Sequence, residues 1–179
     1  MDLLQHQKAS FLRRSFQHIM EPLAQSEVEV AMRKTIEASG RTIGKEALAD
    51  AASSTEGFPF LIQLNGYHIW RQSPQNKRVS KQDVVDGVAL AKADMDRMIL
   101  TTTIGELSRR DLDFLVAMAQ EGSDIRIGRV AERMGTSPSQ ASKHKKRLLA
   151  LGLIEEKPFG VLGFQLPLLR EYLIDHYSE

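Results

Sequence analysis

Residues 127–154 read IGRVAERMGTSPSQASKHKKRLLALGLI. The beginning of this segment has the apolar spacing of a short amphipathic helix. Gly135 then supplies a tight turn, because glycine adopts a positive φ without steric cost. Ser137 and Gln140 have the spacing of a capping box, and Pro138 suits the first position of a new helix. The segment therefore predicts two helices joined by a tight turn.

A hairpin is expected directly after the second of these helices. Residues 153–154 and 164–166 predict two short strands around a turn over residues 155–163 that contains proline and glycine. Pro167 opens a terminal helix that runs through Tyr177. A helix, a tight turn, a second helix and a hairpin make up the plan of a winged helix-turn-helix.

The second helix carries an unbalanced positive charge. Between Ser137 and Arg147 there are four cations and no acid. If Ala141, Leu148 and Leu151 face inward, the solvent-facing positions are Ser139, Gln140, Ser142, Lys143, Lys146 and Arg147. Such a face can reach DNA phosphates and base edges. We expect Lys157, on the hairpin that follows (the wing), to add a further contact with DNA. Two alternatives to DNA binding stay open. The basic face could simply be solvated, or the winged helix could be a module that contacts another protein.

The first half of the chain is predicted to be a helical bundle. Amphipathic spacing predicts helices over residues 3–20, from Ser26 (capped with Glu29) to Gly40, and over residues 45–53. A helix beginning at Pro59 has apolar residues on several sides and is expected to be central and mostly buried. A further helix starts at a Ser80–Asp83 capping pattern. Residues 101–105, with β-branched residues and a glycine, mark the predicted boundary between the two halves.

Composition narrows the function classes. The chain has 179 residues, a formal net charge of +1 and no cysteine. Any attraction to a polyanion must therefore come from a local patch, and disulfides, thiolate zinc sites and cysteine nucleophiles are excluded. No secretory leader or membrane-spanning run is expected, so a cytoplasmic location is predicted, with no membrane partner.

No catalytic motif is recognisable. The stretch from Gly40 to Glu46 superficially resembles a phosphate-binding loop, but its glycines are one residue too close and Glu46 occupies the place of the magnesium-binding Ser or Thr. The five histidines are scattered without the spacing of metal ligands, and no Gly-x-Ser-x-Gly elbow is present. We therefore expect this chain to catalyse nothing alone and to hold no metal or cofactor.

The order of several motifs resembles a known family. They are Phe11-Leu-Arg-Arg-x-Phe, Pro22-Leu23, the capped helix from Ser26, Thr55-x-Gly-Phe-Pro-Phe-Leu-Ile-Gln63, and the winged helix. Together they resemble the C-terminal part of bacterial and archaeal AAA-type ATPases, near origin-recognition initiators and STAND-type signalling ATPases.

The resemblance implies three parts and a role for each. Residues 1–23 correspond to the tail of a missing ATPase core, residues 24–101 to a helical lid, and residues 102–179 to a winged domain. It implies that Gly57, Phe58 and Pro59 lie against the nucleotide of the full-length parent, where ATP and magnesium bind. Many members carry a sensor arginine directly after that proline, whereas this chain has Phe60.

The function expected from this resemblance is coupling of nucleotide state to duplex DNA binding. Two alternatives remain: a regulatory protein-interaction module of a STAND-like ATPase, and a free-standing winged-helix transcription regulator. The protein-interaction alternative predicts a contiguous apolar patch formed by Phe159, Val161 and Phe164.

Overall fold

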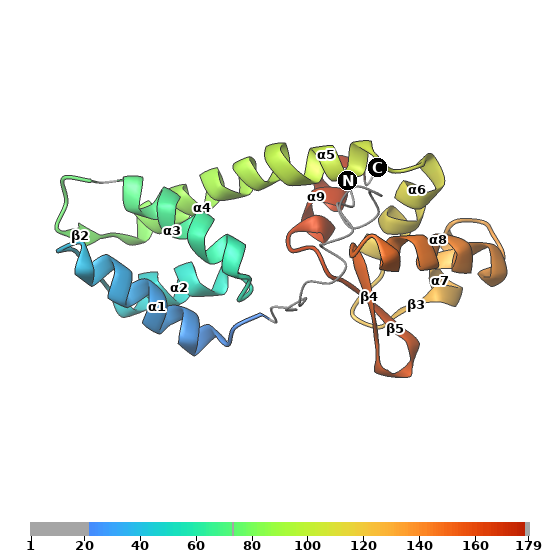
Figure 1. Ribbon diagram of the computed structural model, residues 1–179, viewed down its shortest axis with the longest axis horizontal. Coiled ribbons are helices and arrows are strands. Elements are labelled where there is room, and N and C mark those ends of the chain that lie inside the picture. The colour runs from blue at the N-terminus through green and yellow to red at the C-terminus, as the bar shows by residue number, and fades with distance from the viewer. Residues whose placement is uncertain (1–21, 73, 178–179) are drawn as a thin grey trace, which may run out of the picture.

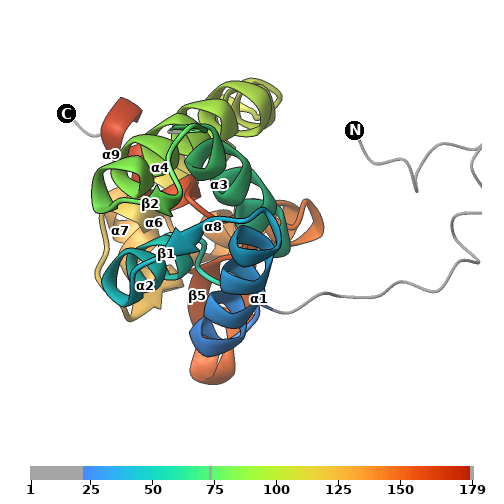
Figure 2. The same cartoon turned by 90° about the vertical axis from the view of Figure 1, so that its left-hand side faces the viewer.

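A computed structural model describes residues 22–72 and 74–177. The fold is mainly α-helical, as predicted, and has two lobes joined by a long helical segment (Figure 1). Viewed from the end of the N-terminal lobe (the helical lobe), α1 (Gln25–Ala38) and α2 (Lys45–Ser53) lie in front of the C-terminal lobe, which we call the winged lobe (Figure 2). The helix predicted over residues 3–20 lies outside the described residues. So does most of the segment 1–23, which was predicted to be the tail of a missing ATPase core.

The helical lobe contains four helices and a minimal parallel pairing of two strands. In chain order they are α1 (Gln25–Ala38), β1 (Thr42–Ile43), α2 (Lys45–Ser53), α3 (Pro59–Gln72), β2 (Arg78–Val79) and α4 (Lys81–Met95). The apolar stripe predicted for α1 is confirmed, because Val28, Met32 and Ile36 are buried. The predicted start of α1 at Ser26 is wrong. The helix begins at Gln25, where Glu27 accepts a hydrogen bond from the Ala24 amide at 3.1 Å.

The helix α3 is less buried than its composition suggests. It begins at Pro59 as predicted, but Phe60, Tyr67 and Trp70 each leave about half of their surface exposed. The buried face is made by Leu61, Asn65 and Ile69. The expectation of a central, mostly buried helix is therefore wrong, because only one face of α3 meets other helices.

A single run of helix continues across the predicted boundary at residues 101–105. After α4, residues Asp96–Leu100 form a π-helical turn (η3), and α5 (Thr101–Gly105) follows without a break. The shift of helical register lies just before the β-branched residues. The division of the chain into domains at residue 101 stays a prediction.

The winged lobe has the element order predicted for a winged helix-turn-helix. Its elements are α6 (Arg109–Ala119), β3 (Ile125–Arg126), α7 (Ile127–Arg133), α8 (Pro138–Ala150), β4 (Ile154–Lys157), a short 3-10 turn (Pro158–Gly160), β5 (Val161–Phe164) and α9 (Leu169–Tyr177). The strands form an antiparallel sheet in the order β3-β5-β4. The hairpin of β4 and β5 projects from the lobe (Figure 1). Strand β3 was not predicted, and β4 and β5 extend closer to the turn than expected.

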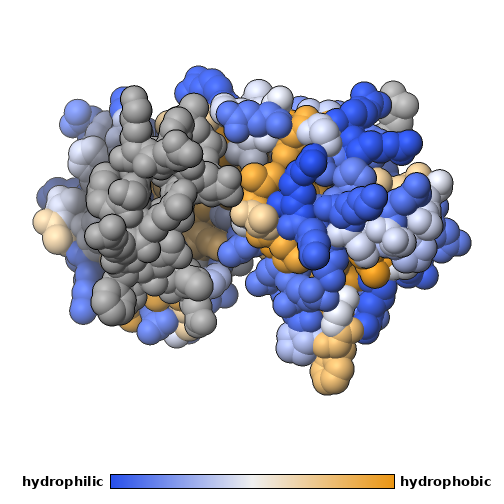
Figure 3. Space-filling view, turned by 45° about the vertical axis from the view of Figure 1, so that its right-hand side comes forward, coloured by the Kyte–Doolittle hydropathy of each residue, from blue (hydrophilic) through white to orange (hydrophobic). Residues whose placement is uncertain are grey.

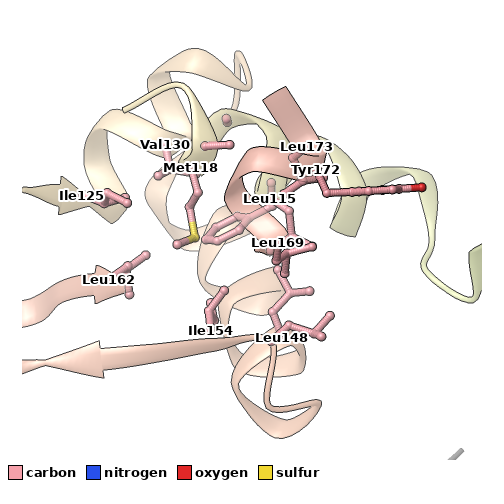
Figure 4. Close-up of a cluster of buried hydrophobic side chains, with 14 of the residues drawn as sticks. Leu115, Met118, Ile125, Val130, Leu148, Ile154, Leu162, Leu169, Tyr172 and Leu173 are labelled. Atoms are coloured by element: carbon pink, nitrogen blue, oxygen red, sulfur yellow. The ribbon is translucent and has the colours of Figure 1, made fainter. Parts of the chain in front are cut away.

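One apolar cluster fills the winged lobe and reaches the helical lobe. Leu115 and Met118 of α6 meet Leu148 of α8 and Leu162 of β5 (Figure 4). Leu61 of α3 belongs to the same buried cluster, together with residues of the α4–η3 segment. The two lobes therefore share part of a core, in addition to the helix that connects them.

Among the described residues, no helix is both long enough and apolar enough to cross a membrane.

Candidate nucleic-acid interface

The helix α8 is positioned by the cap that its sequence predicts. The Ser137 hydroxyl accepts a hydrogen bond from the Gln140 amide at 3.3 Å, and the Gln140 side chain lies 3.5 Å from the Ser137 amide. Ala141 and Leu148 are buried as expected. Leu151 is 52% exposed, so its predicted inward orientation is wrong. It lies just beyond the last residue of α8, where the chain turns toward β4.

The predicted DNA-contacting side chains are exposed together on α8 or on the wing. They are Ser139, Gln140, Ser142, Lys143, Lys146, Arg147 and Lys157. The prediction that they contact DNA stays a prediction. The structure brings the first six onto one helix and places Lys157 on β4.

The lysines of α8 and β4 differ in whether a carboxylate lies within ion-pair distance. Lys145 binds Glu156 at 2.7 Å, and Lys157 binds Glu155 at 3.3 Å, so these lysines are largely offset by wing carboxylates. For Lys143 and Lys146, no carboxylate in the described part of the chain lies within ion-pair distance. These two ammonium groups are therefore the cations of α8 most available to an external anion.

A buried carboxylate holds α8 against α6. Asp111 is 1% exposed, and its two oxygens accept hydrogen bonds from His144 Nδ1 and Arg147, both at 2.8 Å. The Ser108 hydroxyl donates a third bond at 2.6 Å. Burial raises the pKa of Asp111, but the bonds from Ser108, His144 and Arg147 outweigh it, so the net pKa is below the ordinary value. Arg147, predicted to contact phosphate, thus already serves as a brace.

We expect Asp111→Asn to lower the free energy of unfolding by about 2 kcal/mol at neutral pH, the cost of weakened charge-assisted bonds. Because the pKa of Asp111 is lowered by folding, its stabilisation exists above pH about 4 and is lost as the pH falls through the folded-state pKa. The difference between wild type and variant, measured by urea unfolding, should therefore shrink in acid. The matched control is Asp113→Asn on the same helix, whose ion pairs of 3.4 and 3.9 Å are exposed and worth less than about 0.5 kcal/mol. Equal losses in the two variants would contradict the bracing role of Asp111.

A second carboxylate, that of Glu121, holds α7 in place through ion pairs with two of its arginines. Glu121 is nearly buried and accepts bonds from Arg133 and Arg129 at 2.8 to 2.9 Å. The hydrogen bond from Arg133 is the largest cause of a pKa of Glu121 below its ordinary value; desolvation opposes it, and the bond from Arg129 adds to the lowering. Ionic contacts therefore tie both α7 and α8 to other parts of the lobe.

A small hollow lies beside the exposed face of α8. It has a volume of about 260 Å³ and is lined by Arg110, Met134, Thr136, Gln140, Lys143 and His144. Arg110 and His144 were missed by the sequence analysis. Arg110 lies on α6, and no local pattern indicates that it approaches Lys143.

The tip of the wing presents an aromatic side chain to solvent. Phe159 is 92% exposed, its backbone has a φ of 62°, and its carbonyl accepts a hydrogen bond from Arg126. Val161 and Phe164 are only partly exposed, and Phe164 packs against the core. In Figure 3 the lower projection is hydrophobic at its end, whereas hydrophilic residues cover much of the lobe above it. Of the three side chains named by the protein-interaction alternative, Phe159 alone is fully exposed, and that alternative stays a prediction.

The turn at Gly57, Phe58 and Pro59 has a clear structural role. Gly57 has a φ of 75°, and its carbonyl accepts a hydrogen bond from the Leu23 amide at 2.9 Å. A Cβ at this position would lie 2.2 Å from the Leu23 carbonyl oxygen. Phe58 packs against the shared core, and Pro59 begins α3. The nucleotide contact expected of these three residues stays a prediction.

No group of three or more His, Asp or Glu side chains among the described residues could hold a metal ion.

Comparisons with known proteins give the following similarities. A family model described as a domain of unknown function, DUF8462, matches residues 97–173, less than half of the chain. No curated protein matches the sequence. Among solved structures, the chain is similar to a lysine-to-arginine mutant of Thermotoga maritima RuvB, with 15% identity and a TM-score of 0.43. A structure described as the Thermotoga maritima RuvB Holliday junction branch migration motor gives 15% identity and a TM-score of 0.40. In both comparisons 90% of this chain is covered, and it spans about half (53%) of the RuvB chain.

Proposed function

We propose that this chain binds duplex DNA through the exposed face of α8. The observation that carries this proposal is the pair Lys143 and Lys146, whose ammonium groups have no carboxylate within ion-pair distance in the described part of the chain. They lie on a capped, braced helix beside the exposed polar side chains Ser139, Gln140 and Ser142. Lysines of this kind attract phosphates, and serine and glutamine side chains can hydrogen-bond to base edges.

The proposed role of the helical lobe is that of a lid attached to a separate AAA-type core. This part of the proposal rests on the resemblance of the motifs around Gly57 and Pro59. According to this proposal, ATP and magnesium bind to the core, and this chain supplies no catalytic group. The lid changes its position when the nucleotide state of the core changes. The membership of Leu61 in the cluster that fills the winged lobe, with Phe58 packed against that cluster, supports a mechanical connection between the two lobes.

We expect DNA affinity to fall with salt and the double variant Lys143→Ala/Lys146→Ala to flatten that dependence. Each lost phosphate contact reduces the slope of log K against log salt by about 0.9, so the double variant should lose nearly two units of slope. Fluorescence anisotropy of a labelled duplex, titrated at several salt concentrations, measures the slope directly.

The matched control is Lys34→Ala/Lys77→Ala, which removes two exposed lysines from the helical lobe. This control keeps the change in net charge but leaves α8 intact, so its slope should stay close to that of the wild type. An identical slope in both double variants would mean that α8 is not the contact. Absence of any salt-dependent binding by the wild-type chain would overturn the proposal as a whole.

A further inference from the structure

The hollow beside α8 combines three groups that favour an anion. Within the described segments, Lys143 lines it without a carboxylate at ion-pair distance, and Arg110 lines it with only a long contact of 3.9 Å to Asp113. His144 lines it as well, with its ring fixed by Asp111. The volume of about 260 Å³ is below the usual range for drug-sized ligands, about 300–1,000 Å³, which favours a small group over a large molecule.

The contact with Asp111 fixes the role of each His144 nitrogen. An ionised carboxylate only accepts hydrogen bonds, so Nδ1 must be the nitrogen that carries the proton facing Asp111. In the neutral ring Nε2 is then an acceptor and cannot bind an anion. Protonation converts Nε2 into a donor and adds a positive charge to a site that already contains Arg110 and Lys143.

We propose that this hollow binds one backbone phosphate of duplex DNA, held by Arg110, Lys143 and the protonated form of His144. This inference rests on the proposed function and adds a contact on α6 and a dependence on pH. The charged groups facing His144 are Asp111 from α6, Arg110 from α6, and Lys143 and Arg147 from α8. The protonated ring would be a third cationic donor in the hollow, so we expect duplex DNA to bind more tightly as the solution is acidified.

Two isosteric variants of His144 separate its two nitrogens. His144→Asn places an amide near the position of Nδ1 and retains a bond to Asp111, but it has no group at the position of Nε2. His144→Gln places a permanent donor near the position of Nε2. Duplex affinity, measured by anisotropy from pH 6 to pH 8, is expected to rise several-fold in acid for the wild type and to change less for both variants. At pH 8, His144→Gln should bind more tightly than His144→Asn.

Arg110→Gln tests the phosphate contact independently of pH. It should reduce the salt slope by about one, as expected for one lost phosphate contact. The matched control is Arg33→Gln on α1, which removes an arginine with a similarly long pairing of 4.0 Å to Glu37. A thermal melt of each variant confirms that the fold is retained.

Each outcome of these experiments is decisive. An Arg110→Gln slope equal to that of Arg33→Gln, or a pH profile of His144→Asn equal to that of the wild type, overturns the phosphate site. If Lys143→Ala/Lys146→Ala still flattens the slope in that case, DNA binding by α8 stands without the hollow. If the wild type binds no duplex at any pH, both proposals fall.

Discussion

Leu61→Ala is expected to lower the free energy of unfolding by about 3 kcal/mol, within the range for Leu-to-Ala substitutions at buried sites. Leu61 has no exposed surface and packs in the cluster that also contains Phe114 and Leu115 of the winged lobe. The substitution would leave a cavity in the cluster that the two lobes share. Urea unfolding followed by circular dichroism measures the loss.

Phe60→Ala is the matched control for this experiment. Phe60 precedes Leu61 on the same helix and is larger, but it is 47% exposed. If burial determines the effect, the smaller deletion at Leu61 costs more than the larger one at Phe60. A greater loss at Phe60 would mean that the exposed face of α3 is covered in solution and that the shared cluster contributes little.

The local features of this fold could be predicted because they depend on residues a few positions apart. The Ser80–Asp83 and Ser137–Gln140 caps both form with the bonds that their spacing indicates. The start of α1 was mispredicted because two acids compete there. The chain uses Glu27 with the Ala24 amide and does not use Glu29 with Ser26.

The strands of two residues could not be predicted. β1, β2 and β3 are too short to show an alternating pattern, and their pairing is set by how the flanking helices pack. The exposure of one side of α3 is also invisible in the sequence, because apolar spacing around a helix does not say which neighbours are present.

The site was only partly predictable for a similar reason. The exposed residues of α8 follow from helical periodicity and from two buried positions, Ala141 and Leu148. The contacts of Asp111 with His144 and Arg147 join positions 33 and 36 residues apart, and no local pattern encodes them.

Because α3 and α4 pack closely, we expect glycine-to-alanine substitutions at two positions to change the free energy of unfolding in opposite directions. A Cβ added at Gly87 of α4 would lie 2.6 Å from the backbone N and Cα of Ile69 in α3. Backbone atoms cannot move aside as a flexible side chain can, so Gly87→Ala must push the two helices apart. We expect a loss of about 2 kcal/mol in the free energy of unfolding, even though alanine is the better helix former.

Gly66→Ala provides the matched control on the partner helix. Nothing lies within 4 Å of a Cβ at Gly66, so the substitution has only the propensity effect and should stabilise the chain by about 0.5–1 kcal/mol. The same chemical change thus has opposite signs on two adjacent helices, and thermal melts of the two variants are sufficient to show it. Stabilisation by both would mean that α3 and α4 do not approach as closely as Gly87 and Ile69 indicate. The proposal that the helical lobe acts as a lid would then lack the rigid α3–α4 packing that such a lid needs to transmit motion.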